Sequence, residues 1–130
     1  MTIGFVAAVR NAMLDAITTQ TGGSAKLRIY SGTRPATGGA ETTILAELTC
    51  NATFAPAASG GVLTLNSITS AAASASGTAT WARLLKSDGS TVIADMSVGT
   101  SGADCNLNST AISSGATVSV TSATITAGNP

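Results

Sequence analysis

The feature that most constrains the fold is a change in hydrophobic periodicity at Gly22-Gly23. Before this pair, apolar residues recur at the spacing of an α-helix; after it, they alternate with polar residues as in β-strands. Glycine readily adopts the left-handed backbone conformation that ends helices. The sequence therefore predicts a helix over residues 3–20 that ends at the glycine pair and precedes a β-rich body.

The predicted helix carries most of its apolar residues on one side. Asn11, Asp15 and Thr18 lie on the opposite side, and Leu14 breaks the pattern. No second amphipathic helix follows, so we expect the apolar stripe to pack against the chain's own sheet or against another subunit. The stripe consists of Phe5, Val6, Val9, Ala12, Met13, Ala16 and Ile17.

The rest of the chain is divided into short segments with β-strand periodicity. Asp88-Gly89 separates two of them and favours a hairpin, because both residues tolerate a positive φ. The pattern predicts a mainly β fold, a β-sandwich or jelly roll of about seven or eight strands with one N-terminal amphipathic helix. We expect one domain over 1–130, with the helix in 1–21 and the sandwich in 24–130. The expected strands are 25–30, 44–50, 62–68, 77–86, 90–98, 105–112 and 117–125.

The glycine-containing segment 31–43 raises the question of a phosphate-binding loop. A P-loop requires Lys-Ser/Thr directly after its second glycine and then a helix, whereas Gly38-Gly39 precedes Ala40-Glu41 and a predicted strand. Arg34-Pro35 favours an extended bend. We therefore expect a solvent-facing or partner-facing loop that binds no nucleotide.

The reactive side chains do not form a catalytic pattern. The chain has no histidine, and its six carboxylates are scattered without a metal-binding or acid–base spacing. We therefore expect no enzyme activity, no cofactor, no metal and no small-molecule substrate.

Charge and hydropathy exclude further classes of partner. Six basic and six acidic residues give zero formal net charge and form no basic cluster, which argues against nucleic-acid binding. No run of 18 apolar residues predicts a membrane span, and no secretory cleavage pattern follows the apolar N-terminus. Charged residues make up only 9% of the chain, which is compatible either with a Ser/Thr-rich soluble domain or with a component of an assembly.

The two cysteines, Cys50 and Cys105, lie 55 positions apart and match no metal-binding spacing. Each has apolar neighbours at strand spacing. This pattern favours buried free thiols, and a disulfide between them is the alternative.

Five segments together resemble a family of small structural proteins of tailed phages and prophages, some of which are capsid cement (decoration) proteins. They are 10–17, 30–48, 61–69, 77–112 and 119–129. The resemblance implies a jelly-roll β-sandwich that forms homodimers and binds across neighbouring major capsid subunits on the outer capsid surface, after synthesis in the host cytoplasm. Both cysteines lie outside the family pattern, which argues against a required disulfide.

The functional expectation is a non-enzymatic virion protein that stabilises contacts between capsid subunits. A phage tail or fibre domain that binds a host receptor is the alternative, and an exported adhesin module is disfavoured by the missing signal. Arginine, tyrosine and tryptophan dominate interface hot spots, although the strand residues are equally compatible with core or ordinary surface positions. The candidate interface residues are Phe5, Val9, Met13, Ile17, Arg28, Tyr30, Arg34 and Trp81.

Overall fold

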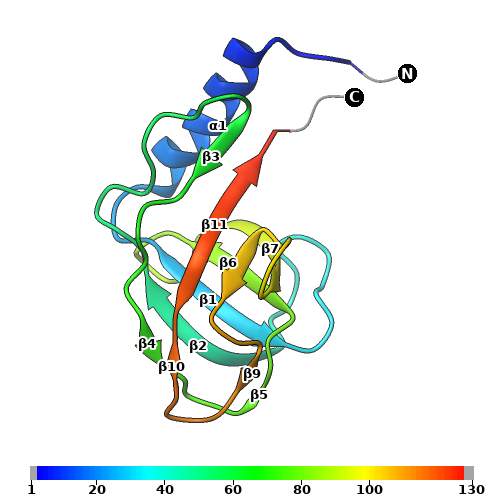
Figure 1. Ribbon diagram of the computed structural model, residues 1–130, viewed down its shortest axis with the longest axis vertical. Coiled ribbons are helices and arrows are strands. Elements are labelled where there is room, and N and C mark those ends of the chain that lie inside the picture. The colour runs from blue at the N-terminus through cyan, green and yellow to red at the C-terminus, as the bar shows by residue number, and fades with distance from the viewer. Residues whose placement is uncertain (1–2, 128–130) are drawn as a thin grey trace.

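The computed structural model describes residues 3–127 and shows a mainly β chain with one N-terminal helix, as the sequence predicts (Figure 1). Residues 1–2 and 128–130 of the predicted domain lie outside the described residues. The elements are α1 (Ala7–Thr21), β1 (Lys26–Ser31), β2 (Thr43–Thr49), β3 (Val62–Thr64), β4 (Ala71–Ala72), β5 (Gly77–Thr78), β6 (Trp81–Leu85), β7 (Val92–Gly99), β8 (Cys105–Leu107), β9 (Ala111–Ile112), β10 (Thr117–Val118) and β11 (Val120–Thr126).

Seven strands form one mixed sheet in the order β2-β1-β6-β7-β8-β11-β3. Neighbouring strands within this sheet pair antiparallel, except for β7 and β8, which are parallel. The pairs β10-β4 and β5-β9 form two small sheets. In Figure 1, the long strand β11 crosses in front of β1 and β2. Buried side chains from both parts of the sheet belong to one core cluster. The large sheet therefore curls into two layers that face each other across the core.

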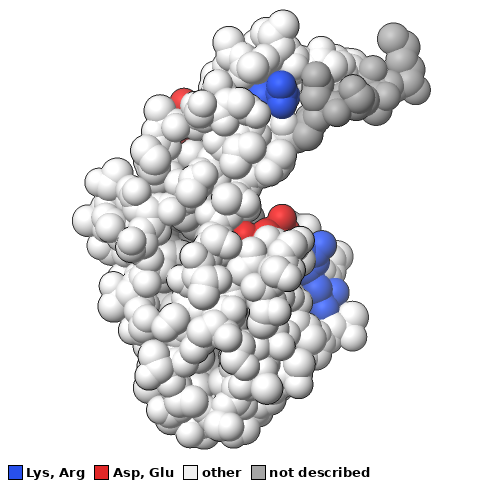
Figure 2. All heavy atoms as spheres, viewed as in Figure 1, with Lys and Arg blue, Asp and Glu red and all other residues white. Residues whose placement is uncertain are grey.

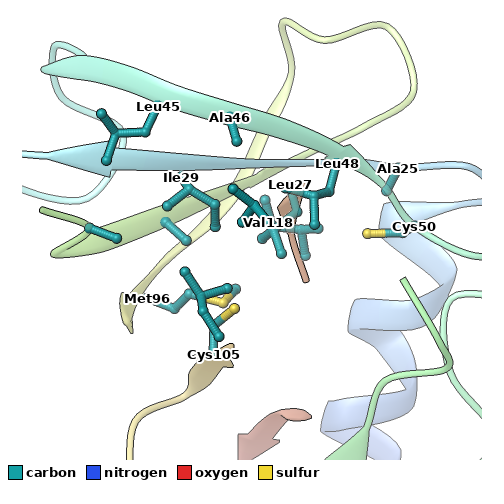
Figure 3. Close-up of a cluster of buried hydrophobic side chains, with 14 of the residues drawn as sticks. Ala25, Leu27, Ile29, Leu45, Ala46, Leu48, Cys50, Met96, Cys105 and Val118 are labelled. Atoms are coloured by element: carbon teal, nitrogen blue, oxygen red, sulfur yellow. The ribbon is translucent and has the colours of Figure 1, made fainter. Parts of the chain in front are cut away.

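The core forms where the inward residues of β1 and β2 meet those of the opposite layer. Figure 3 shows Ile29 and Leu45 pointing toward Met96 and Cys105, with Val118 beside Leu27. Each of these residues is at most 5% exposed. Full burial of an aliphatic side chain contributes about 1.5–3 kcal/mol, so this cluster is the main source of stability for the β body.

The predicted hairpin at Asp88-Gly89 is confirmed: it connects the antiparallel strands β6 and β7, and Gly89 has φ 70°. The Asp88 carboxylate accepts hydrogen bonds from the Thr91 hydroxyl and from the backbone N–H groups of Ser90 and Thr91. These bonds, led by the one from the Thr91 hydroxyl, lower the pKa of Asp88 to about 2. The turn is thus fixed by its own aspartate.

Three of the predicted strands are each divided in two, because the chain changes sheet within them. Segment 77–86 forms β5, which pairs with β9, and then β6, which pairs with β1 and β7. At the corner between them, the N–H of Ala79 donates to Thr110 O and the N–H of Thr80 donates to Tyr30 O. Segments 105–112 and 117–125 divide in the same way, into β8 and β9 and into β10 and β11.

The helix ends where the sequence predicts but begins later. Gly22 caps the C-terminus with φ 72°, and its N–H donates to Thr18 O. The predicted start at residue 3 is wrong, since α1 begins at Ala7. Val6 is extended (φ −63°, ψ 156°) and its side chain makes no cap, and Gly4 is a poor helix former. Residues 3–6 therefore precede α1 as a non-helical segment (Figure 1).

Candidate functional site

The helix α1 contacts the β body with its polar side. Asn11 Oδ1 accepts the backbone N–H of Gly61 at 2.9 Å, and Asp15 Oδ1 accepts the backbone N–H of Ala58 at 2.8 Å. Both acceptors satisfy backbone donors in the loop before β3. The prediction placed these two residues opposite the packing side, and the structure reverses that orientation.

Leu14 packs α1 against the β body and is 2% exposed. One turn earlier, Arg10 Nη1 donates to the carbonyl of Ala127 at 3.3 Å, so the end of β11 is also held against the helix. The prediction treated Leu14 as an exception to the stripe. It is in fact the main hydrophobic contact of the helix, and Ile17 packs beside it as a partly buried residue.

The predicted apolar stripe lies mostly on the outer side of α1. Val9 is 42% exposed and Met13 is 49% exposed, and the preceding Ile3 and Val6 are each 70% exposed. Phe5 is 42% exposed and lies before the helix. The sequence left two packing partners open for the stripe, the chain's own sheet and another subunit. For Val9 and Met13, this exposure excludes packing against the chain's own sheet.

A pocket of about 240 Å³ opens between α1, β7 and β11. Figure 2 shows the molecule hollowed between the part that carries α1 and the lower body, with acidic atoms at the edge of the hollow. We call this space the β7–β11 pocket. Its lining is apolar at Ile17, Ala94, Met96 and Ile125 and acidic at Asp95 and Asp104.

On the outer face of the sheet, Tyr30 of β1 stacks on Trp81 of β6, with ring centroids 4.2 Å apart and an interplanar angle of 12°. The Arg83 guanidinium lies 5.1 Å from the Trp81 ring centre. Tyr30 and Trp81 are both fully buried. The expectation that they anchor a surface contact is therefore wrong for the folded chain, in which they form a second, smaller core.

The loop between β1 and β2 covers this stack. Trp81 Nε1 donates to Thr42 Oγ1 at 2.9 Å, and Arg83 Nη2 donates to Gly39 O at 2.8 Å. From the loop, the N–H of Gly38 donates to Asp95 Oδ2 at 3.0 Å. The segment 31–43 is a loop, as predicted, but one side of it packs on the sheet.

Arg83 and Asp95 form a buried ion pair beneath this loop. Their side chains are 4% and 1% exposed, and Nε–Oδ1 and Nη2–Oδ2 distances are 2.7 and 3.0 Å. Burial raises the pKa of Asp95, but Arg83 and the Gly38 N–H outweigh it, so the net pKa is lowered. Sequence spacing gave no signal for this pair, because its partners lie on different strands.

The Arg28 guanidinium is fixed by ion pairs and a hydrogen bond within the same chain. It bonds Glu47 at 2.7 Å, Glu41 at 2.9 Å and the carbonyl of Gly89 at 2.9 Å. The bond to Glu47 is the largest of the effects that raise the pKa of Arg28. Arg34 is exposed on the loop. Of the two predicted arginines, Arg34 is therefore the more accessible for an external contact.

Both cysteines are buried free thiols, as their apolar neighbours at strand spacing favoured. Burial raises the pKa of Cys50 to about 11 and the pKa of Cys105 to about 12. We expect neither thiol to react with a thiol-specific reagent such as DTNB at pH 8 in the folded protein, because the reactive form is the thiolate. Both should react after denaturation in guanidinium. Rapid labelling of either thiol without denaturant would contradict this burial.

Within residues 3–127, no group of three or more carboxylates and thiols could hold a metal ion. No helix in the same range has the length and apolar character needed to cross a membrane. No family model, no curated protein and no solved structure matches this chain.

Proposed function

We propose that this protein is a non-enzymatic virion component that binds the outer surface of a tailed-phage capsid and stabilises contacts between major capsid subunits. The observation that carries the proposal is the orientation of α1. Its polar residues Asn11 and Asp15 bond to the β body, while Val9 and Met13 point outward. An apolar helix side turned to the outside is suited to a protein partner.

The exposed apolar side of α1 offers one local contact surface. We call it the outer helix face and define it by Val9 and Met13. Burying apolar surface stabilises a contact by roughly 25 cal/mol per Å². One such contact is weak, but a shell repeats it at every subunit, so the summed effect on the particle is large.

The low charge of the chain supports the same role. Only 9% of the residues are charged, so covering the surface removes water from few charged groups and costs little desolvation free energy. The face in Figure 2 carries only a few charged side chains. A homodimer fits this function, because a two-fold unit applies the same patch to two neighbouring capsid subunits.

The test uses a double substitution on the outer helix face, Val9→Asp with Met13→Asp. Both residues are about half exposed, so we expect the variant to fold with a stability within about 0.5 kcal/mol of wild type. We expect it to lose cosedimentation with capsids that lack the protein, at least tenfold relative to wild type. Capsids supplied with wild type should withstand heat better than capsids supplied with the variant.

The matched control is Ala12→Asp with Thr19→Asp, which adds the same charge at exposed positions outside the outer helix face. It should bind capsids like wild type. Wild-type protein that binds purified tails but not capsids would replace the proposal with a host-binding role. Capsid binding that survives the Val9→Asp/Met13→Asp change would show that the contact lies elsewhere.

A further inference from the structure

The large sheet has a gap where β8 is too short for its neighbours. Strand β7 has eight residues and β11 has seven, but β8, which lies between them, has only three. It pairs with β7 only at Val98 and Gly99, and with the first residues of β11. Because both longer strands flank β8, they are separated beside it by two strand spacings, about 10 Å. The space beyond the end of β8 therefore has the width of one strand.

The side chain and the backbone of Asp104 close the end of this gap next to β8. Its carboxylate accepts the N–H of Ser97 at 3.2 Å, and its carbonyl accepts the N–H of Thr124 at 3.0 Å. In an antiparallel pair, the backbone groups of alternate residues point to the same side. The backbone N–H groups of Ser97 and Thr124 point toward β8 and the gap. The backbone groups of Asp95 on β7 and Thr126 on β11, two residues further along, therefore point into the gap as well. No strand within residues 3–127 pairs with these two positions on that side.

The side chains give the gap one apolar side and one polar side. The β7–β11 pocket lies at this gap, and Ala94, Met96 and Ile125 face the core and α1. Asp95 and Thr126 lie on the opposite side of their strands, where residues alternate. A strand that enters the gap would meet apolar surface with every second side chain. Its other side chains would lie beside the buried Asp95 on β7 and the exposed Thr126 on β11.

The segment before α1 has the matching pattern. Ile3 and Phe5 are two residues apart and would share one face of an extended strand. Ile3 is 70% and Phe5 42% exposed, and the segment leaves the helix away from the body in Figure 1. In number, its four described residues, 3–6, lie between the two β11 residues and the five β7 residues that extend beyond the Asp104 contacts. We call these residues the N-terminal arm.

We propose that the N-terminal arm of a second copy adds as a short strand between β7 and β11. Ile3 and Phe5 then lie over Ile17, Met96 and Ile125, and the arm backbone pairs with Asp95 and Thr126. If each copy gives its arm to the other, the exchange closes as a two-fold dimer. The inference goes beyond capsid binding, because it concerns the contact between copies and can be tested on purified protein alone.

The experiment measures the oligomeric state by light scattering coupled to size-exclusion chromatography. Wild type should be a dimer. The arm variant Ile3→Asp/Phe5→Asp should raise the dimer dissociation constant by about a hundredfold, since it places charge against apolar surface. The pocket variant Thr126→Pro should have a similar effect, because proline removes the N–H that faces the gap. Circular dichroism checks that both variants fold.

Mixing distinguishes arm exchange from other contacts. The arm variant keeps an intact gap and the pocket variant keeps an intact arm, so an equimolar mixture should regain dimers through one complete arm-and-gap contact. Val9→Asp, a charge on the outer helix face, should leave the dimer intact. A monomeric wild type, a dimer that survives the arm variant, or a dimer lost in Val9→Asp would each overturn the proposal. Capsid binding by a monomer would overturn it while leaving the proposed function in place.

Discussion

Replacing Asp95 with asparagine should lower the free energy of unfolding by about 3 kcal/mol or more at pH 7. The substitution keeps the shape of the side chain but leaves the Arg83 guanidinium, 4% exposed, without a counter-charge. It also weakens the bond from the Gly38 N–H that holds the loop on the sheet. Chemical denaturation at pH 7 gives the difference, and fluorescence of the single tryptophan, Trp81, reports the local environment.

The loss of stability caused by Asp95→Asn should depend on pH, because Asp95 of the Arg83–Asp95 ion pair titrates. The folded-state pKa of Asp95 is lowered, so its stabilising contribution is complete above the ordinary carboxyl value, about 4. The contribution is lost as the pH falls through the lowered folded-state pKa. The difference between wild type and Asp95→Asn should therefore narrow in acid. The control Arg83→Met/Asp95→Leu removes both charges and should recover much of the loss; an equal or larger loss in this control would contradict the explanation by an unpaired charge.

Replacing Leu14 with alanine should cost about 2–5 kcal/mol, whereas Met13→Ala should cost about 0.5 kcal/mol or less. The two residues are adjacent in sequence, but Leu14 is 2% exposed and Met13 is 49% exposed. Both substitutions favour the helix by propensity, so the difference reports packing alone. Unfolding curves of the two variants against wild type provide the measurement. Equal effects would mean that Leu14 does not seat the helix.

The β body follows closely from the sequence because its signals are local. Leu27 and Ile29 alternate with Lys26 and Arg28, and this alternation places the first two in the core. The hairpin at Asp88-Gly89 is fixed by residues within the turn. The mainly β class could be predicted for the same reason, whereas the strand lengths and the sheet changes within three segments depend on pairing with distant strands.

The orientation of α1 could not be predicted from its pattern. A helical projection sorts side chains by polarity and assumes that the apolar side faces the chain's own core. Here Asn11 and Asp15 are needed as acceptors for backbone donors of the loop before β3, and Leu14 alone provides the apolar contact. These backbone donors are brought next to the helix only by the tertiary structure, so a helical projection cannot show them.

The buried aromatic stack shows a second limit of sequence patterns. Tyr30 alternates with the core residue Ile29 and lies with its strand neighbour Trp81 on the outer face of the sheet, away from the main core. Alternation does not show that the loop bearing Gly39 and Thr42 returns to cover that face. The β7–β11 pocket was missed for a related reason, since it depends on the lengths of three neighbouring strands.

The strand order of the large sheet also has a kinetic consequence. Neighbouring strands β1 and β6 are separated by about 50 residues, and β3 and β11 by about 55. Each pair must close a long loop before its contacts form, and topologies of this kind fold in milliseconds to seconds. Because β11 pairs with both β3 and β8, the second layer cannot form until β11 has been synthesised. The nascent chain therefore has to keep its apolar strands from aggregating until nearly all of the described residues have left the ribosome.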